Sequence, residues 1–152
     1  MRTDETASIL ASIPGGIELL NWFQGNPNFG DAEVLSLSLN RDGPSTLCVG
    51  VYKPVESSYE AVIVTITLCD MIDVELEGFS YQNVIGSLTI SRATERQVHK
   101  NLLGIGLTLP DHLLVLEPCA GAFGRIYATV SKISFESSAT SMRWQAELRK
   151  KN

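Results

Sequence analysis

The sequence predicts an α+β protein: a single domain over residues 1–152, mainly an antiparallel sheet or sandwich of six to seven strands, with short helices at the N- and C-terminal ends. Three observations favour this class. Serine and leucine alternate from Leu35 to Leu39, and apolar residues occupy every second position from Val62 to Leu68. Turn-forming residues interrupt the chain roughly every 8–12 residues, as in many antiparallel proteins. A period of two is typical of strands with one face in a core and one face in solvent.

Two short helices are expected before the sheet. Residues 4–13 can form a helix with Thr3 or Asp4 as N-cap, and Pro14-Gly15-Gly16 would end it. Residues 16–24 are rich in large apolar side chains and fit a second helix that packs on the sheet. Residues 25–30 contain glycine, asparagine and proline, so they predict a loop.

The remaining elements are mostly strands, expected at residues 32–40, 46–52, 59–69, 74–77, 84–91, 113–116 and 125–135. The first two strands are joined by turn residues and predict a hairpin. The strongest prediction is 59–69, because Val, Ile and Thr dominate it. Residues 119–124 are small and glycine-rich, as in a tight connection or bulge. Residues 94–103 fit either a short helix or a long loop, and a final helix is expected after Thr140.

Length and composition describe an ordinary globular chain. The 152 residues suffice for a domain that buries roughly 70% of its unfolded surface. No apolar run approaches the ~18 residues that a membrane-spanning helix needs. The N-terminus is a poor signal peptide, so we expect a cytoplasmic protein. The odd number of cysteines, Cys48, Cys69 and Cys119, predicts reduced thiols that act as small buried hydrophobic residues.

Charge is distributed unevenly along the chain. The net charge is −5, but residues 1–142 hold 8 of the 12 Lys and Arg and 16 of the 17 Asp and Glu. The excess of acidic residues in 1–142 argues against binding a nucleic-acid backbone, which requires clustered Lys and Arg. It suits a basic protein partner, because opposite potentials speed the encounter.

Residue spacing predicts no catalytic centre, metal site or cofactor site. Neither histidine, His99 or His112, stands in the sequence context of a Ser or Cys nucleophile. The cysteines have no ligand partners at the short spacings of zinc sites. Gly104-Ile105-Gly106 lacks the third glycine and the Lys-Ser/Thr pair of a phosphate-binding loop. We therefore expect a protein without enzymatic activity.

Four acidic residues are the most suggestive group: Asp70, Asp73, Glu75 and Glu77. On a strand, the last three would share one face at steps of about 6.6–7 Å. Four interpretations remain open: a solvated strand face, a docking surface for a basic partner, acid–base chemistry together with a histidine, and binding of a divalent cation. The docking hypothesis adds three aromatic anchors, Tyr52, Tyr59 and Tyr81.

Three segments of the sequence, FGDAEVLSLSLNRDG, ELEGFSYQNV and CAGAFGRIYATVSKISF, have the character of family motifs. Together they resemble the immunity protein 50 family of bacterial polymorphic-toxin systems, and the similarity extends over about residues 22–135. The family often has a histidine before Asp-Ala-Glu, where this chain has Gly30. The matching motif residues are Asp31, Glu33, Glu77, Phe79, Gln82 and Asn83.

The resemblance implies a cytoplasmic protein, monomer or homodimer, that binds and neutralises a cognate toxin domain without catalysis. We interpret the motif residues as mostly structural. Phe79 would plug the end of the sheet, while Gln82 and Asn83 would satisfy backbone groups of a turn. Two alternatives are a structural domain that self-associates through a strand edge and a small hydrolase that uses the acidic residues with His99 or His112.

Overall fold

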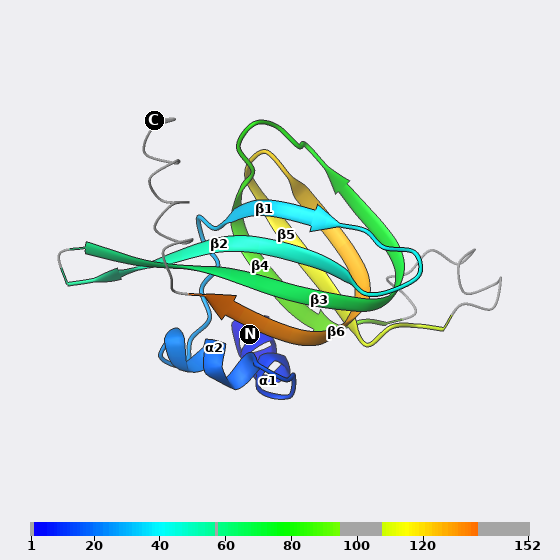
Figure 1. Ribbon diagram of the computed structural model, residues 1–152, viewed down its shortest axis with the longest axis horizontal. Coiled ribbons are helices and arrows are strands. Elements are labelled where there is room, and N and C mark those ends of the chain that lie inside the picture. Colours follow the sequence, from blue (N-terminus) through cyan, green and yellow to red (C-terminus); the bar gives the residue numbers. More distant parts are fainter. Residues whose placement is uncertain (1, 57, 95–107, 137–152) are drawn as a thin grey trace.

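Six antiparallel strands form a closed barrel in the computed structural model, with two short helices at its N-terminal end (Figure 1). The structure describes residues 2–56, 58–94 and 108–136. The helices are α1 (Arg2–Ala11) and α2 (Gly16–Trp22), and the strands are β1 (Glu33–Ser38), β2 (Ser45–Val55), β3 (Ser58–Glu77), β4 (Val84–Arg92), β5 (His112–Ala120) and β6 (Phe123–Glu136). The predicted α+β class is confirmed, whereas the predicted C-terminal helix and nearly all of 94–103 lie outside the described residues.

The strands follow the order β1-β2-β3-β6-β5-β4 around the barrel, and β1 returns to pair with β4. The expected β1–β2 hairpin is present, with Leu37 opposite Leu47 and Val34 opposite Val49. Every pair of neighbouring strands is antiparallel. Because the sheet closes on itself, a barrel replaces the open sheet or sandwich that alternation alone suggested.

The clearest difference from the sequence prediction concerns β3. Residues 59–69 and 74–77 were expected as separate strands, but β3 is one strand of 20 residues that pairs with β6 along most of its length. Cys69 pairs with Thr129 and Asp73 with Tyr127, so residues 70–72 stand opposite a single residue of β6. The extra residues form a bulge, which bends the strand without reversing the chain.

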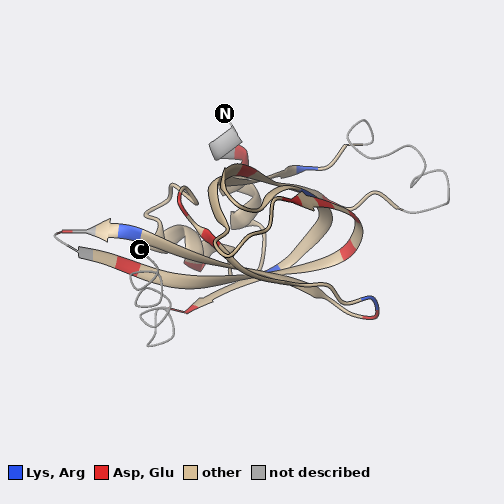
Figure 2. Cartoon of the chain, turned by 90° about the horizontal axis from the view of Figure 1, so that it is seen from above, with Lys and Arg blue, Asp and Glu red and all other residues tan. Residues whose placement is uncertain are grey.

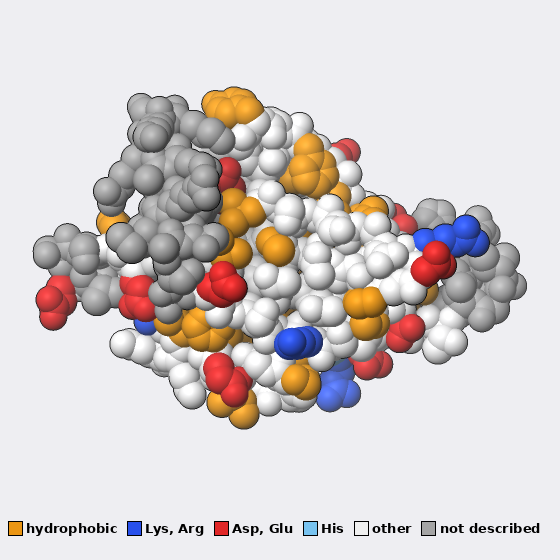
Figure 3. Space-filling model, in the orientation of Figure 1, with side chains coloured by type: hydrophobic (Ala, Val, Ile, Leu, Met, Phe, Trp, Pro, Cys, Tyr) orange, Lys and Arg blue, Asp and Glu red, His pale blue; other side chains and the backbone are white. Residues whose placement is uncertain are grey.

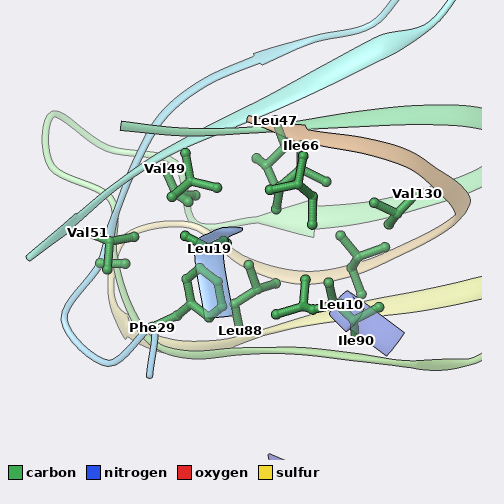
Figure 4. Packing of buried hydrophobic residues seen from close by; sticks show 14 of the residues in the cluster. Leu10, Leu19, Phe29, Leu47, Val49, Val51, Ile66, Leu88, Ile90 and Val130 are labelled. Carbon is green, nitrogen blue, oxygen red and sulfur yellow. The ribbon is translucent and has the colours of Figure 1, made fainter. Parts of the chain in front are cut away.

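One hydrophobic cluster fills the barrel, and both helices contribute to it. Leu10 of α1 and Leu19 of α2 are 0% exposed and lie among the side chains of the barrel interior (Figure 4). Their neighbours in this cluster include Leu47, Ile66 and Ile90. Inward-facing residues alternate with outward-facing ones along each strand, so a narrow barrel is filled by its own side chains. The helices therefore complete the core as well as covering it.

Hydrogen bonds to strand backbones fix the helical segment to two different strands. The Thr6 hydroxyl accepts a hydrogen bond from the Ile90 amide (3.1 Å) and donates one to the Ile90 carbonyl (3.3 Å). One side chain thus satisfies both backbone groups that would otherwise pair with a neighbouring strand. The Ile133 amide donates to the Pro14 carbonyl at 2.9 Å. Figure 1 shows the two helices together on one side of the barrel, next to the end of β6. The turn between the helices is therefore in direct contact with β6.

We predict that Gly15→Ala destabilises the protein strongly. Gly15 has a φ of 86°, and an added Cβ would overlap the carbonyl of Ile133. The matched control is Gly25→Ala, because Gly25 has a φ of 91° but no atom within 4 Å of an added Cβ. The free energy of unfolding of the control should fall by only about 1–2 kcal/mol, the cost of placing alanine in a left-handed conformation. Gly15→Ala should lose about 3 kcal/mol or more in urea unfolding, because it displaces the turn from β6. Equal losses in the two variants would contradict this contact.

Candidate partner-binding surface

Three segments that are far apart in the sequence meet where the barrel closes between β1 and β4. The Val34 amide donates to the Asn83 carbonyl, and the Ile85 amide donates to the Ala32 carbonyl, both at 2.8 Å. The Asn83 side-chain oxygen also accepts a hydrogen bond from the Ala122 amide at 3.1 Å, in the turn between β5 and β6. We call residues 31–34, 78–84 and 119–124 the closure seam. It contains five of the six motif residues, namely Asp31, Glu33, Phe79, Gln82 and Asn83, and the start of the third similar segment.

Asn83 also fixes the loop that precedes it. Its side-chain oxygen accepts from the Ser80 amide (2.9 Å), and its side-chain nitrogen donates to the Ser80 carbonyl (3.1 Å). The Ser80 hydroxyl donates to the Gln82 carbonyl at 2.7 Å. The prediction that Asn83 satisfies backbone groups of a turn is confirmed. Gln82 contributes its backbone to this network.

The loop carries two exposed aromatic side chains. Phe79 is 54% exposed and Tyr81 is 82% exposed. The prediction that Phe79 plugs the end of the sheet is therefore wrong, because the hydrogen bonds of Asn83 hold this loop with the ring in solvent. We call residues 78–83 the aromatic loop. A large apolar ring on a fixed loop loses little conformational entropy when a partner covers it.

The acidic residues next to the aromatic loop form the row of three that the sequence predicted. Asp73, Glu75 and Glu77 alternate with Val74 and Leu76, which pack against the core, so the three acids share the outer face of β3. Glu75 pairs with Arg125 at 3.1 Å. Both side chains are about half exposed, and such pairs contribute little stability. The ion pair nevertheless neutralises the middle of the row.

Asp70 does not belong to this row. It lies in the bulge of β3 with a φ of 50° and lines an open hollow of about 790 Å³ together with Arg41, Leu68 and Met71. Figure 2 shows Asp and Glu spread over separate strands and turns. On the face in Figure 3, hydrophobic side chains form several separate groups with acidic side chains near them. This face of the molecule is therefore a mixture of apolar and acidic positions.

Tyr52 and Tyr59 lie elsewhere, on the β2–β3 hairpin that extends beyond the barrel (Figure 1). Their ring centroids are 5.5 Å apart and the rings are nearly perpendicular, at 88°. Tyr52 is 37% exposed and Tyr59 is 58% exposed. The seven predicted binding residues therefore fall into three places: this tyrosine pair, the row of Asp73, Glu75 and Glu77 next to Tyr81 of the aromatic loop, and Asp70 by itself in the bulge.

His112 has a structural partner. Its Nδ1 atom accepts a hydrogen bond from the Val130 amide at 3.0 Å. Burial lowers the pKa of His112; Asp111 opposes this shift and Arg92 adds to it. The neutral imidazole that the hydrogen bond requires is therefore the favoured form.

His112 and the acidic row point away from each other. Leu113 pairs with Tyr127, which in turn pairs with Asp73, so those three share one face. His112 precedes Leu113, and alternation directs its side chain to the opposite face. His99 lies outside the described residues. Among the residues that the structure describes, no group of three His, Cys, Asp or Glu side chains could hold a metal ion.

The cysteines are free thiols, and Cys48 and Cys69 are partly buried. The prediction of burial is wrong for Cys119, which is exposed, because β5 extends past the core at its C-terminal end. In the described parts of the chain, no helix has the length and apolar character to cross a membrane. No family model, curated protein or solved structure matches this chain.

We predict that Asn83→Ala destabilises the protein by about 2 kcal/mol, because it removes three hydrogen bonds and leaves the partly buried Ala122 amide without its acceptor. Asn28→Ala is the control, because Asn28 makes one exposed hydrogen bond to the Gly30 amide. The control should lose less than about 1 kcal/mol. Urea unfolding measures both values, and a loss for Asn83→Ala no greater than that of the control would argue against its role in closure.

Acid should destabilise the protein through His112. Because the folded pKa is below the unfolded value of about 6.5, the unfolded state binds more protons in the window below that value. This contribution to stability is complete above about pH 6.5 and is lost as the pH falls through the folded pKa. His112→Asn keeps an acceptor near the position of Nδ1 but cannot titrate. Unfolding free energies at several pH values should fall less steeply for this variant, and parallel curves would refute the assignment.

Proposed function

We propose that this chain is an immunity protein, which binds a cognate toxin domain and neutralises it without catalysis. The observation that carries the proposal is the aromatic loop, where Phe79 and Tyr81 are exposed on a backbone fixed by Asn83. The resemblance of the seam segments to an immunity-protein family supports the same function. The filled barrel agrees with it, because its side chains form a core that leaves the outer surface for recognition.

The physics of interfaces explains why this loop suits a partner. A few aromatic side chains usually supply most of the binding free energy, and they act best when they are already in the bound conformation. Glu77 directly precedes the loop and is exposed, so the rim is acidic. A toxin with a basic surface would gain in association rate, since opposite charges steer the encounter.

We predict that the Phe79→Ala/Tyr81→Ala double variant binds the toxin at least about 100-fold more weakly, because two anchors are lost. The toxin to test is the protein encoded by the neighbouring gene, in a binding assay and in a growth-protection assay. Ile17→Ala is the control, because Ile17 of α2 is also 54% exposed but lies away from the seam. The control should bind and protect like the unchanged chain.

Two results would overturn the proposal. One is a neighbouring protein that is toxic but neither binds nor is neutralised. The other is a double variant that binds as tightly as the Ile17→Ala control. The self-associating structural domain predicts a different outcome, namely a stable oligomer of the chain alone and no protection of cells. Size-exclusion chromatography beside the protection assay separates that alternative from an immunity protein.

A further inference from the structure

A second feature of the surface is a corner formed by three side chains at the base of the β2–β3 hairpin. Tyr52 and Tyr59 provide two nearly perpendicular rings, both partly exposed. Asp31 lies close to Tyr52: it stands two residues before Glu33, which begins β1 and pairs with Gly50, two residues before Tyr52. Electrostatics agree with this placement, since burial raises the pKa of Tyr52 and the charge of Asp31 raises it further.

Contacts on the other side of the hairpin hold it in place against α2. On the opposite face of the hairpin, Lys53 donates a hydrogen bond to the Trp22 carbonyl, and its ammonium lies 4.4 Å from the centre of the Trp22 ring. The Trp22 indole nitrogen donates to a Glu60 carboxylate oxygen at 2.9 Å. These contacts fix the hairpin to α2. They also direct Lys53 away from the corner, so the cation on this part of the hairpin does not neutralise Asp31.

We propose that the corner of Asp31, Tyr52 and Tyr59 binds an arginine side chain of a partner protein. The face of a tyrosine ring attracts a cation, and a nearby carboxylate adds charge and hydrogen-bond acceptors. A guanidinium suits this geometry better than an ammonium, because it is planar, stacks on a ring and forms two parallel hydrogen bonds to a carboxylate. The net negative charge of the chain, −5, favours a partner with positive charge.

The inference rests on the proposed function for the identity of the partner, but its chemistry is testable without a toxin. The probes are the peptides Gly-Arg-Gly and Gly-citrulline-Gly, which differ in one positive charge, and Gly-Lys-Gly. The full chain is titrated with each probe while the ring signals of its tyrosines are followed by NMR. Tyr81, on the aromatic loop, and the buried Tyr127 serve as internal references.

We expect the signals of Tyr52 and Tyr59 to move with the arginine peptide at about three- to fivefold lower concentration than with the citrulline peptide. Asp31→Asn should remove most of this difference. Asparagine tolerates the left-handed φ of 63° at this position, so the variant keeps the backbone conformation. Tyr59→Leu provides a second variant that retains an apolar side chain on the exposed hairpin.

Three outcomes would overturn the inference: equal shifts with arginine and citrulline, equal shifts at Tyr81, and a lysine peptide that binds as well as the arginine peptide. These results are independent of the toxin experiment. If no toxin is bound, the titration still decides the chemistry of the corner. If the toxin is neutralised but the arginine peptide leaves Tyr52 and Tyr59 unmoved, the corner alone is refuted and the proposed function stands.

Discussion

Closure of the barrel between β1 and β4 is the constraint on which the rest of the structure depends. These strands share a single register pair, Glu33 with Val84, so the ladder alone provides few bonds. Asn83 compensates for this, because its carbonyl accepts from β1 while its side chain binds both its own loop and the turn between β5 and β6. One residue thus connects three parts of the barrel, and its bond to the Ala122 amide is partly buried, where a group without a partner is costly.

The same bonds couple stability to recognition. The loop that Asn83 orders carries Phe79 and Tyr81, so the conformation that closes the barrel also presents these rings to solvent. Close packing at the seam enforces this arrangement: a Cβ at Gly78 would lie 2.6 Å from the Gly121 carbonyl. Asn83 and Gly78 of the seam therefore have a structural reason to be present, whereas the exposed side chains beside them carry no such constraint.

The alternation of apolar and polar residues predicted most strands well, because this pattern lies within each strand and does not depend on its partners. Long-range pairing was not predictable in this way. The continuity of β3 depends on β6 pairing on both sides of the bulge at Asp70, and barrel closure depends on contacts between Glu33 and Val84. Phe79 was misplaced for the same reason, since hydrophobicity indicates burial but the direction of a ring depends on the loop. The approach of Asp31 to Tyr52 required the register of β1 and β2.

The two recognition features are close enough to serve one partner. Glu33 pairs with Val84, just after the aromatic loop, and on its other side with Gly50, two residues from Tyr52. Neighbouring strands are about 4.8 Å apart, so β4 and β2 are separated across β1 by about 10 Å. A standard interface covers about 800 Å² on each partner, a patch roughly 30 Å across, which exceeds that separation. If the proposed function and the proposed arginine site both hold, one partner reaches both features, and recognising both together is more selective than recognising either alone.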